Sequence, residues 1–496
     1  MTNQDYSRRN FMSHLGSGVS GLALNSLFSQ NSSQANADVN AFSPPDGDPH
    51  FRPRAKSVIW IFLVGGMSHL ESFDPKPELN KYAGKSISET PYKDAATNPL
   101  VRDNLREFVA GQHKVLPNIY PLQVGYRACG ASGILMSDWF QHLPKVADEL
   151  AIVRSMWTTD NDHGAQLQFH TGRHALEGQF PTIGSWIRYG LARLSDEVPQ
   201  FIVLGTPLAD CCGGMGGHGS NYLGPEFAGV PVSVDRNNPL PYASPGSSVY
   251  REEQMANFEL LRSLHRLAQE ESVEDTQLRA RIASYELAFR MQSSIPRLVD
   301  VEQETSDTHG LYGINTAPTD TFGRQCLVAR RLVETGTRFV QIYHGSTGGA
   351  GAWDAHSNLE KGHREQIAQI DKPIAGLIAD LKQRGLLDET LVVLATEFGR
   401  TPGAEGTNGR DHHPFGFSIA MAGAGIRKGV VHGATDELGF HAVEDRHYVT
   451  DVHATVMHLM GLEARRLEIP GRKRLEVDYG NPITAIMTRV SAGALL

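Results

Sequence analysis

Histidine and carboxylate side chains that could do chemistry gather in short clusters, far apart along the chain. They are His69 with Asp74, Asp160 to His163, Asp354 with His356, Glu397 with Arg400, and Asp411 with His412. Zinc and manganese sites in proteins use such mixed imidazole and carboxylate ligands. Asp354 and His356 are two residues apart, so an extended segment would point both side chains the same way. The clusters therefore predict a divalent-metal site, at which a bound ion could polarise an oxygen and activate water.

Each cluster follows an apolar run that is typical of a buried strand. The runs cover residues 57–64, 150–154, 201–204, 338–343, 391–395 and 417–421. Helical patterns lie between them, at 278–289 and 359–381, and residues 250–292 read as a helical pair. In the second pattern we expect Ser357 to cap the helix and Pro373 to kink or break it. The alternation predicts an α/β fold whose strand ends gather the polar clusters at one edge of a parallel sheet.

Composition excludes several classes of protein. The 496 residues carry a net charge of −9 and no cluster of Lys and Arg in the mature region, so we expect no nucleic-acid partner. A run of about 20 apolar residues is missing, which predicts no membrane span. Four cysteines cannot build a dense disulfide framework. The adjacent Cys211 and Cys212 could bind a soft metal with His218, but we expect inert thiols in a flexible loop.

The N-terminus reads as a twin-arginine export signal, because Arg8 and Arg9 stand in the pattern S-R-R-x-F ahead of a short apolar stretch. A cleavage site of the A-x-A type ends at Ala37. We therefore predict a signal peptide at residues 1–37 and a periplasmic or cell-envelope location. An extended lead-in would cover 38–56, one α/β domain 57–487, and a tail 488–496. Within the domain, residues 75–130 and 206–250 are rich in Gly, Pro, Asn and Ser and are predicted to be loop insertions.

Four ordered motifs together carry a resemblance to a known family. They are residues 65–77 (GGMSHLESFDPKP), 353–356 (WDAH), 396–402 (TEFGRTP) and 409–412 (GRDH). The chain resembles the exported sulfatase-like family called domain of unknown function 1501, within the alkaline phosphatase and sulfatase superfamily, over about residues 55–487. The resemblance implies an alkaline-phosphatase-like sandwich with a central, mostly parallel sheet flanked by helices. It also implies hydrolysis of sulfate or phosphate esters, on a small molecule or a polysaccharide.

The resemblance also implies a set of metal ligands. Asp354 and His356 match the pair that binds the first metal in the superfamily, and His412 matches the later histidine that completes this site. The superfamily's Asp-His pair for a second metal corresponds to Glu397 and Phe398, which leaves one carboxylate. We therefore expect one divalent ion, with a second still open, and Zn or Mn rather than Ca because Ca prefers oxygen ligands.

Two departures from the superfamily concern the first strand and the nucleophile. The first strand ends in Gly65-Gly66 instead of a metal-binding Asp, which leaves Ser68, His69 or Asp74 as substitutes. Residues 170–173 (HTGR) resemble the sulfatase L-T-G-R segment, which places Asp162 where the modified cysteine would stand. The formylglycine mechanism is therefore unavailable. The candidate nucleophiles are Thr158, Thr159, Asp162 and a metal-bound water.

Other interpretations of the same residues remain open. Arg400 or His163 could stabilise an anion, and Arg400 could equally bind loop carbonyl groups. Asp354, His356, Glu397 and His412 could form a hydrogen-bonded polar cluster that braces loops. The alternative function is a non-catalytic member of the superfamily that binds a polysaccharide or a cell-envelope partner.

Overall fold

The computed structural model describes residues 45–95, 116–240, 250–271, 276–469, 471–472 and 474–488. The predicted signal peptide at residues 1–37 lies outside these ranges, as does the predicted tail beyond residue 488. The described part of the predicted lead-in, residues 45–56, forms neither helix nor strand. It runs along the end of a C-terminal helix, where Arg54 donates its backbone N–H to the Leu459 carbonyl at 2.8 Å.

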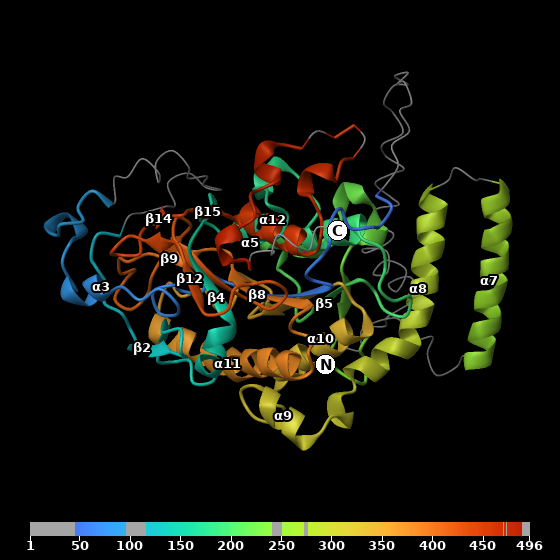
Figure 1. Cartoon of the computed structure of the whole chain (residues 1–496), viewed down its shortest axis with the longest axis horizontal. Helices are drawn as coiled ribbons and strands as arrows, with labels where there is room; N and C mark the ends of the chain where they lie inside the picture. Colours follow the sequence, from blue (N-terminus) through green and yellow to red (C-terminus); the bar gives the residue numbers. More distant parts are fainter. Residues whose placement is uncertain are drawn as a thin grey trace, which may run out of the picture.

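A nine-stranded sheet forms the centre of the molecule (Figure 1). Its strands, in spatial order, are β12 (Val430–His432), β4 (Leu150–Trp157), β11 (Phe417–Ala422), β8 (Thr390–Thr396), β1 (Ser57–Leu63), β7 (Phe339–His344), β5 (Phe201–Leu204) and β6 (Val230–Val232), with β15 (His447–Tyr448) also beside β4. β11 runs antiparallel to both of its neighbours, and the other pairs are parallel. The six apolar runs of the sequence all form strands, so the predicted mostly parallel sheet is confirmed.

Helices cover both faces of this sheet, as Figure 1 shows. One face packs on α10 (Asp320–Thr335) and α11 (Leu359–Gln383), and the other on α5 (Gly164–Thr171), α6 (Ile183–Gly190) and α12 (Val449–Leu459). Side chains of β1 alternate between the two cores: Ile59 and Ile61 face α10 and α11, whereas Trp60 and Phe62 join the other cluster. Because both faces are buried, β1 reads as a continuous apolar run.

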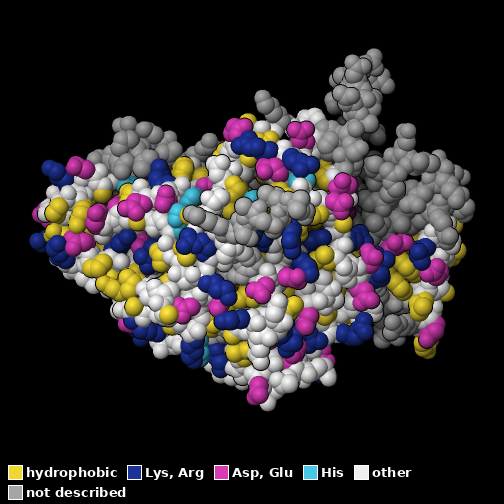
Figure 2. Space-filling view, viewed as in Figure 1, with side chains coloured by type: hydrophobic (Ala, Val, Ile, Leu, Met, Phe, Trp, Pro, Cys, Tyr) yellow, Lys and Arg dark blue, Asp and Glu magenta, His cyan; other side chains and the backbone are white. Residues whose placement is uncertain are grey.

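The remaining elements lie around this sandwich. They are α3 (Pro77–Lys81), β2 (Tyr126–Cys129), β3 (Ile134–Ser137), α7 (Arg251–Glu271), α8 (Thr276–Val299), α9 (Ser306–Tyr312), β9 (Gly399–Arg400), β10 (His412–His413), β13 (Ala434–Thr435) and β14 (Ala442–Glu444). The predicted helical pair is confirmed as α7 and α8. None of the helices in the described ranges is long and apolar enough to cross a membrane. On the face in Figure 2, basic and acidic side chains are interspersed.

Two local predictions are wrong. Residues 75–130 and 206–250 were predicted to be loop insertions, but α3 and β2 lie within the first stretch, and β6 lies within the second and pairs with β5. This strand has three residues, V-P-V, and its proline suits the edge position that it occupies, so no apolar run marks it. The second concerns α11, which runs unbroken through Pro373 and whose N-cap is Asn358 rather than Ser357.

Three buried histidines should make the stability of the fold depend on pH. Burial lowers the pKa of His170 to about 3 and those of His218 and His453 to about 4. Their ordinary value is 6.5, so the unfolded chain binds more protons between about pH 6.5 and 4. Stability is therefore full above pH 6.5 and falls as the pH drops. We expect the free energy of unfolding in urea to fall by up to about 1.4 kcal/mol per pH unit for each histidine.

The variant His218→Leu tests this prediction. Both ring nitrogens of His218 are buried without a hydrogen-bond partner among the described residues, so leucine removes a titrating group and no hydrogen bond. The pH slope of its unfolding free energy should be shallower than that of the wild type. The same slope in both proteins would contradict the prediction.

Candidate metal centre

The sheet topology gathers the predicted clusters at one edge. Four strands of the sheet run in the same direction and end at this edge: β1, β4, β7 and β8. Among them lies β11, which runs in the opposite direction and therefore begins at this edge. The chain leaves β8 at this edge and enters β11 at the same edge. In between, β9 pairs with β10, where Arg400 lies opposite His412. The segments that follow β1, β4, β7 and β8 therefore meet the segment that precedes β11 at this edge of the sheet.

Gly65 and Gly66 at the end of β1 make this convergence possible. Both have positive φ angles, +122° and +90°. A Cβ atom on Gly65 would lie 2.5 Å from the backbone nitrogen of Asp354, and one on Gly66 would overlap the ring of Phe398. The backbone before Asp354 thus occupies the space that a side chain at this strand end would need, so this close approach requires glycine.

Asp354 lies at the centre of three imidazole rings. Its Oδ1 is 3.1 Å from Nε2 of His356 and 3.2 Å from Nε2 of His412, and its Oδ2 is 3.3 Å from Nε2 of His163. The Nε2 atoms of His356 and His412 are 2.9 Å apart. Ligands that bind one ion at about 2.0–2.1 Å stand about 3.0–3.4 Å from each other in octahedral or tetrahedral geometry. The spacings among Asp354, His356 and His412 therefore fit a single coordination shell, and His163 forms a group of ligand atoms with Asp354 and His412.

The other ring nitrogen of each histidine faces an acceptor outside the cluster. Nδ1 of His412 is 2.8 Å from the carbonyl oxygen of Asn161, and Nδ1 of His356 is 2.5 Å from Oε2 of Glu405. Nδ1 of His163 is 3.3 Å from Oε1 of Glu397. For His356 and His412, an acceptor at Nδ1 assigns the proton of the neutral ring to Nδ1, so the Nε2 lone pair points toward Asp354. Nδ1 of His163 faces both the Glu397 carboxylate and the amide nitrogen of Gln166, each at 3.3 Å. Imidazole nitrogens and a carboxylate that face one another are the donor set of a cation site.

Burial and charge shift the pKa values of the cluster in opposite directions. Burial favours the neutral form of His163, but its hydrogen bonds with Asp354 and Glu397 outweigh burial and raise its pKa to about 9. Burial lowers the pKa of His412 to about 3. Burial would also raise the pKa of Asp354, yet its histidine partners and Arg400 hold that pKa well below its usual range. Asp354 is therefore ionised at every physiological pH.

Glu397 and Arg400 lie behind the cluster. Oε1 of Glu397 accepts hydrogen bonds from the backbone N–H of Gly65 at 2.8 Å and from Gln166 at 3.0 Å, besides its contact with His163. Arg400 is fully buried and donates to the carbonyl groups of Gly65, Gly66, Trp353 and Arg410 as well as to Oδ1 of Asp354 at 2.9 Å. The guanidinium donors of Arg400 thus bind loop carbonyl groups and Asp354. Of its two predicted roles, this arrangement matches the binding of loop carbonyl groups.

Several predicted site residues lie elsewhere. His69 is buried with Nε2 2.9 Å from the Gly439 carbonyl, and it is not among the grouped ligand atoms of the described residues. Asp162 accepts a hydrogen bond from the backbone N–H of its neighbour His163 at 2.7 Å. The hydroxyl of Thr158 donates to Oε1 of Gln168 and that of Thr159 accepts from its Nε2, at 2.7 and 2.8 Å. Cys211 and Cys212 are free thiols outside the metal-ligand groups in the described part of the chain.

Two acidic residues near the cluster were not among the predicted ligands: Asp411, which the sequence analysis named only as a neighbour of His412, and Glu405, which it did not name. Asp411, His356 and His412 form a second group of ligand atoms within reach of one ion, and Glu405 holds the ring of His356. Asp411 adjoins His412 in the chain, so its position was a usable signal, whereas Glu405 has no recognisable spacing. Both groups require Nε2 of His412, because the Nδ1 of that ring faces Asn161. A single nitrogen lone pair binds one ion, so the two groups cannot hold two separate ions at the same time.

Comparisons with known proteins identify the family. A family model described as "Protein of unknown function (DUF1501)" matches residues 55–487. No curated protein matches the chain. The similar solved structures include the PsFucS1 sulfatase from Pseudoalteromonas sp., with 12% identity and a TM-score of 0.33 over 97% of this chain and 76% of that one.

Two further similar structures are hydrolases of other esters. The alkaline phosphatase from the Antarctic bacterium TAB5 has 9% identity and a TM-score of 0.32, over 83% of this chain and 99% of that one. The phosphonate monoester hydrolase of Agrobacterium radiobacter has 10% identity and a TM-score of 0.37, over 89% and 78%. The family model spans most of the chain and all four sequence motifs, so this protein belongs to the DUF1501 family.

Proposed function

We propose that this protein is an exported hydrolase of sulfate or phosphate esters that depends on one divalent metal ion. Asp354, His163, His356 and His412 would hold the ion. The observation that carries the proposal is the convergence of three Nε2 atoms on one carboxylate, with an acceptor at every Nδ1. Three imidazole ligands favour Zn or Mn over Ca. The N-terminal motif supports export by the twin-arginine route, to the periplasm or cell envelope.

The proposal changes the roles of two predicted residues. His163, which the sequence offered as a catalytic group, becomes a ligand because its Nε2 faces Asp354. Glu397, which the sequence offered as a ligand, becomes the residue that orients His163. Arg400 fixes the position of Asp354 and offsets part of its charge. A bound divalent ion would polarise the ester oxygen and make water an effective nucleophile near neutral pH.

The chain's own residues favour water over a side chain as the nucleophile. The hydroxyl groups of Thr158 and Thr159 are engaged by Gln168, and Thr158 is fully buried. Asp162 remains a candidate that a variant can test. The cluster opens on the side of His356, whose side chain is 39% exposed, against 9% for His412. We therefore expect the ester to approach past His356, between Glu405 and Asp411.

The hydrogen bond from His356 to Glu405 gives a graded prediction. Glu405→Gln should weaken metal binding by about 10- to 100-fold without abolishing it, because the amide holds the ring less firmly and makes Nε2 a poorer donor. Competition with a fluorescent zinc chelator measures this change. Glu360→Gln, on the exposed surface of α11, is the matched control and should bind metal as the wild type does. Equal affinity in all three proteins would show that Glu405 does not support a metal ligand.

The experiment that tests the proposal is a substrate screen with the metal-loaded protein. Aryl sulfates, phosphate monoesters, phosphate diesters and sulfated oligosaccharides are incubated with protein that has been loaded with Zn or Mn. We expect turnover of at least one class, lost on removal of the metal and in Asp354→Ala. Background rates with every class would exclude the hydrolase and favour the alternative.

The alternative is a non-catalytic protein that binds a polysaccharide or a cell-envelope partner through the same fold. The observation in its favour is that residues 158–163 offer no cysteine and that both threonine hydroxyls are already hydrogen-bonded. Binding of a sulfated polysaccharide that survives Asp354→Ala, without turnover, is the result that would support it.

A further inference from the structure

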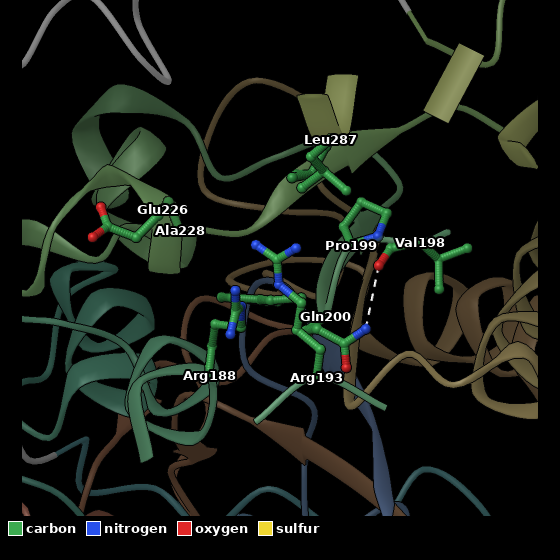
Figure 3. A pocket seen from close by; sticks show the side chains of 10 residues that line it. Arg188, Arg193, Val198, Pro199, Gln200, Glu226, Ala228 and Leu287 are labelled. Carbon is green, nitrogen blue, oxygen red and sulfur yellow. Dashed lines mark hydrogen bonds between the residues drawn. The ribbon is translucent and has the colours of Figure 1, made fainter. Parts of the chain in front are cut away.

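A small cavity lies at the edge of the sheet opposite the metal centre. Its volume is about 20 Å³, and its walls include Arg188, Arg193, Gln200, Glu226 and Leu287 (Figure 3). Phe201 and Val230, the first residues of β5 and β6, also line it. The cavity is therefore at the amino ends of these strands, whereas the metal ligands follow the carboxyl ends of β4, β7 and β8. The two sites are separate.

Two arginines from one short segment point into this cavity. Arg188 belongs to the last turn of α6, and Arg193 follows three residues after the helix ends. Figure 3 shows their guanidinium groups close to each other beside Gln200, while the carboxylate of Glu226 is directed away from them. Both arginines line the same cavity, so the two positive charges lie near one another. The cavity thus concentrates positive charge.

Neither arginine has a close, buried carboxylate partner among the described residues. Arg188 makes no hydrogen bond and no ion pair with any residue of the described ranges, and its guanidinium lies 5.6 Å from the ring centre of Phe227. Arg193 contacts Asp196 at 3.6 Å, but that aspartate is 80% exposed. Two fully buried arginines contact a carboxylate closely: Arg410 contacts Glu71 and Arg400 contacts Asp354, at 2.8 and 2.9 Å. Arg188, which is partly buried, has no such contact among the described residues.

An uncompensated charge of this kind is costly. Removing a guanidinium from water without a partner disfavours the folded state, and a second positive charge nearby adds repulsion. Burial and the charge of Arg193 lower the pKa of Arg188 to about 10, whereas the charge of Glu226 acts in the opposite direction. Burial raises the pKa of Glu226, and Oε2 of Glu226 has no hydrogen-bond partner among the described residues, so Glu226 offsets only part of the positive charge. An anion from solution would offset the rest.

We propose that this cavity binds a small oxyanion of the sulfate or phosphate class through Arg188 and Arg193. Guanidinium groups offer forked N–H donors that match the oxygens of such anions. Gln200 donates to the carbonyls of Ser195 and Val198, at 2.9 and 3.2 Å, and so holds the wall that carries Arg193 in place. The volume suits a free ion or the terminal group of a larger molecule. This site does not depend on the proposed hydrolysis.

Thermal unfolding tests the proposal. The unfolding midpoint is measured while sodium sulfate or sodium phosphate replaces sodium chloride at constant ionic strength. We expect a saturable rise in the midpoint, with the same apparent Kd in the wild type and in Asp354→Ala, which lacks the central metal ligand. Arg188→Gln and Arg193→Gln should each raise that Kd by about tenfold or more. Arg236→Gln, which removes an exposed arginine, is the matched control and should leave the Kd unchanged.

The sign of the stability change separates binding from a structural role. Without an oxyanion, Arg193→Gln should raise the unfolding midpoint because it removes repulsion from Arg188; with saturating sulfate it should lower the midpoint. If Arg193 had only a structural role, Arg193→Gln would lower the unfolding midpoint both with and without sulfate. A rise that does not saturate, or equal Kd values in the arginine variants and Arg236→Gln, would overturn the proposal. If Arg188→Gln does not fold, an anomalous selenate peak beside Arg188 in wild-type crystals supports the site, and its absence at saturating selenate contradicts it.

Discussion

Asp354→Ala is expected to lose the metal ion and, with it, all metal-dependent turnover. Asp354 touches all three histidines, so its removal deletes one ligand and the group that holds the others together. It also leaves the buried Arg400 without its carboxylate. We expect the affinity for Zn or Mn to fall by about a thousandfold or more, since changes to residues that only hydrogen-bond to a ligand already cost about 10- to 100-fold. Elemental analysis after gel filtration and an ester-hydrolysis assay measure the two effects.

Asp162→Ala is the matched control for this variant. Asp162 lies beside His163 in the chain but contacts only its backbone, so the variant should keep the metal. If it keeps both metal and turnover, water is the nucleophile. Loss of turnover with full metal content would restore Asp162 as the nucleophile that the sequence suggested. Asp354→Ala protein that retains stoichiometric metal would refute the assigned ligand set.

Arg410→Met is expected to destabilise the protein by about 3–5 kcal/mol, the cost of breaking a buried ion pair from one side. Arg410 is fully buried, and its guanidinium lies 2.8 Å from Oε1 of Glu71. It also donates to the carbonyls of Thr401 and Pro402 on one segment and of Tyr120 and Pro121 on another. These bonds hold the hairpin that carries His412, so metal affinity should fall with stability. Urea unfolding gives the free energy.

A double variant separates the buried charge from the lost hydrogen bonds. Arg410→Met leaves the carboxylate of Glu71 buried and unpaired, so adding Glu71→Gln should recover part of the loss. We expect the double variant to be more stable than Arg410→Met alone. If the two changes are additive, the ion pair is not the main contribution of Arg410, and the four carbonyl contacts are.

The sequence predicts the centre of the sheet well because those strands are buried on both faces. β1 and β8 are continuous apolar runs with a clear start and end, and the segments that follow them are polar. The edge strands are different. β6 has three residues with a proline, and β12 is only partly buried, so neither produces an apolar run. The reversal of β11 also leaves no trace in its own composition.

The candidate site is predictable in its residue types and less so in its roles. Asp354, His356 and His412 follow or precede strands that the sequence marks, and the structure brings all three together. The sequence does not show whether His163 or Glu397 faces Asp354. In the structure the backbone N–H of Gly65 donates to Glu397 and so directs that carboxylate away from Asp354. Glu405 lies in the connection between β9 and β10 and contacts His356. No periodic pattern in the sequence predicts this contact.

Metal content measures the central claim most directly. The folded wild-type protein is incubated separately with Zn, Mn and Ca, freed of unbound ions by gel filtration, and analysed for metal and protein in the same fractions. The account predicts about one Zn or Mn ion per chain and little Ca, because the donor set contains three imidazole nitrogens. A wild-type protein that remains free of metal under all three conditions would contradict it.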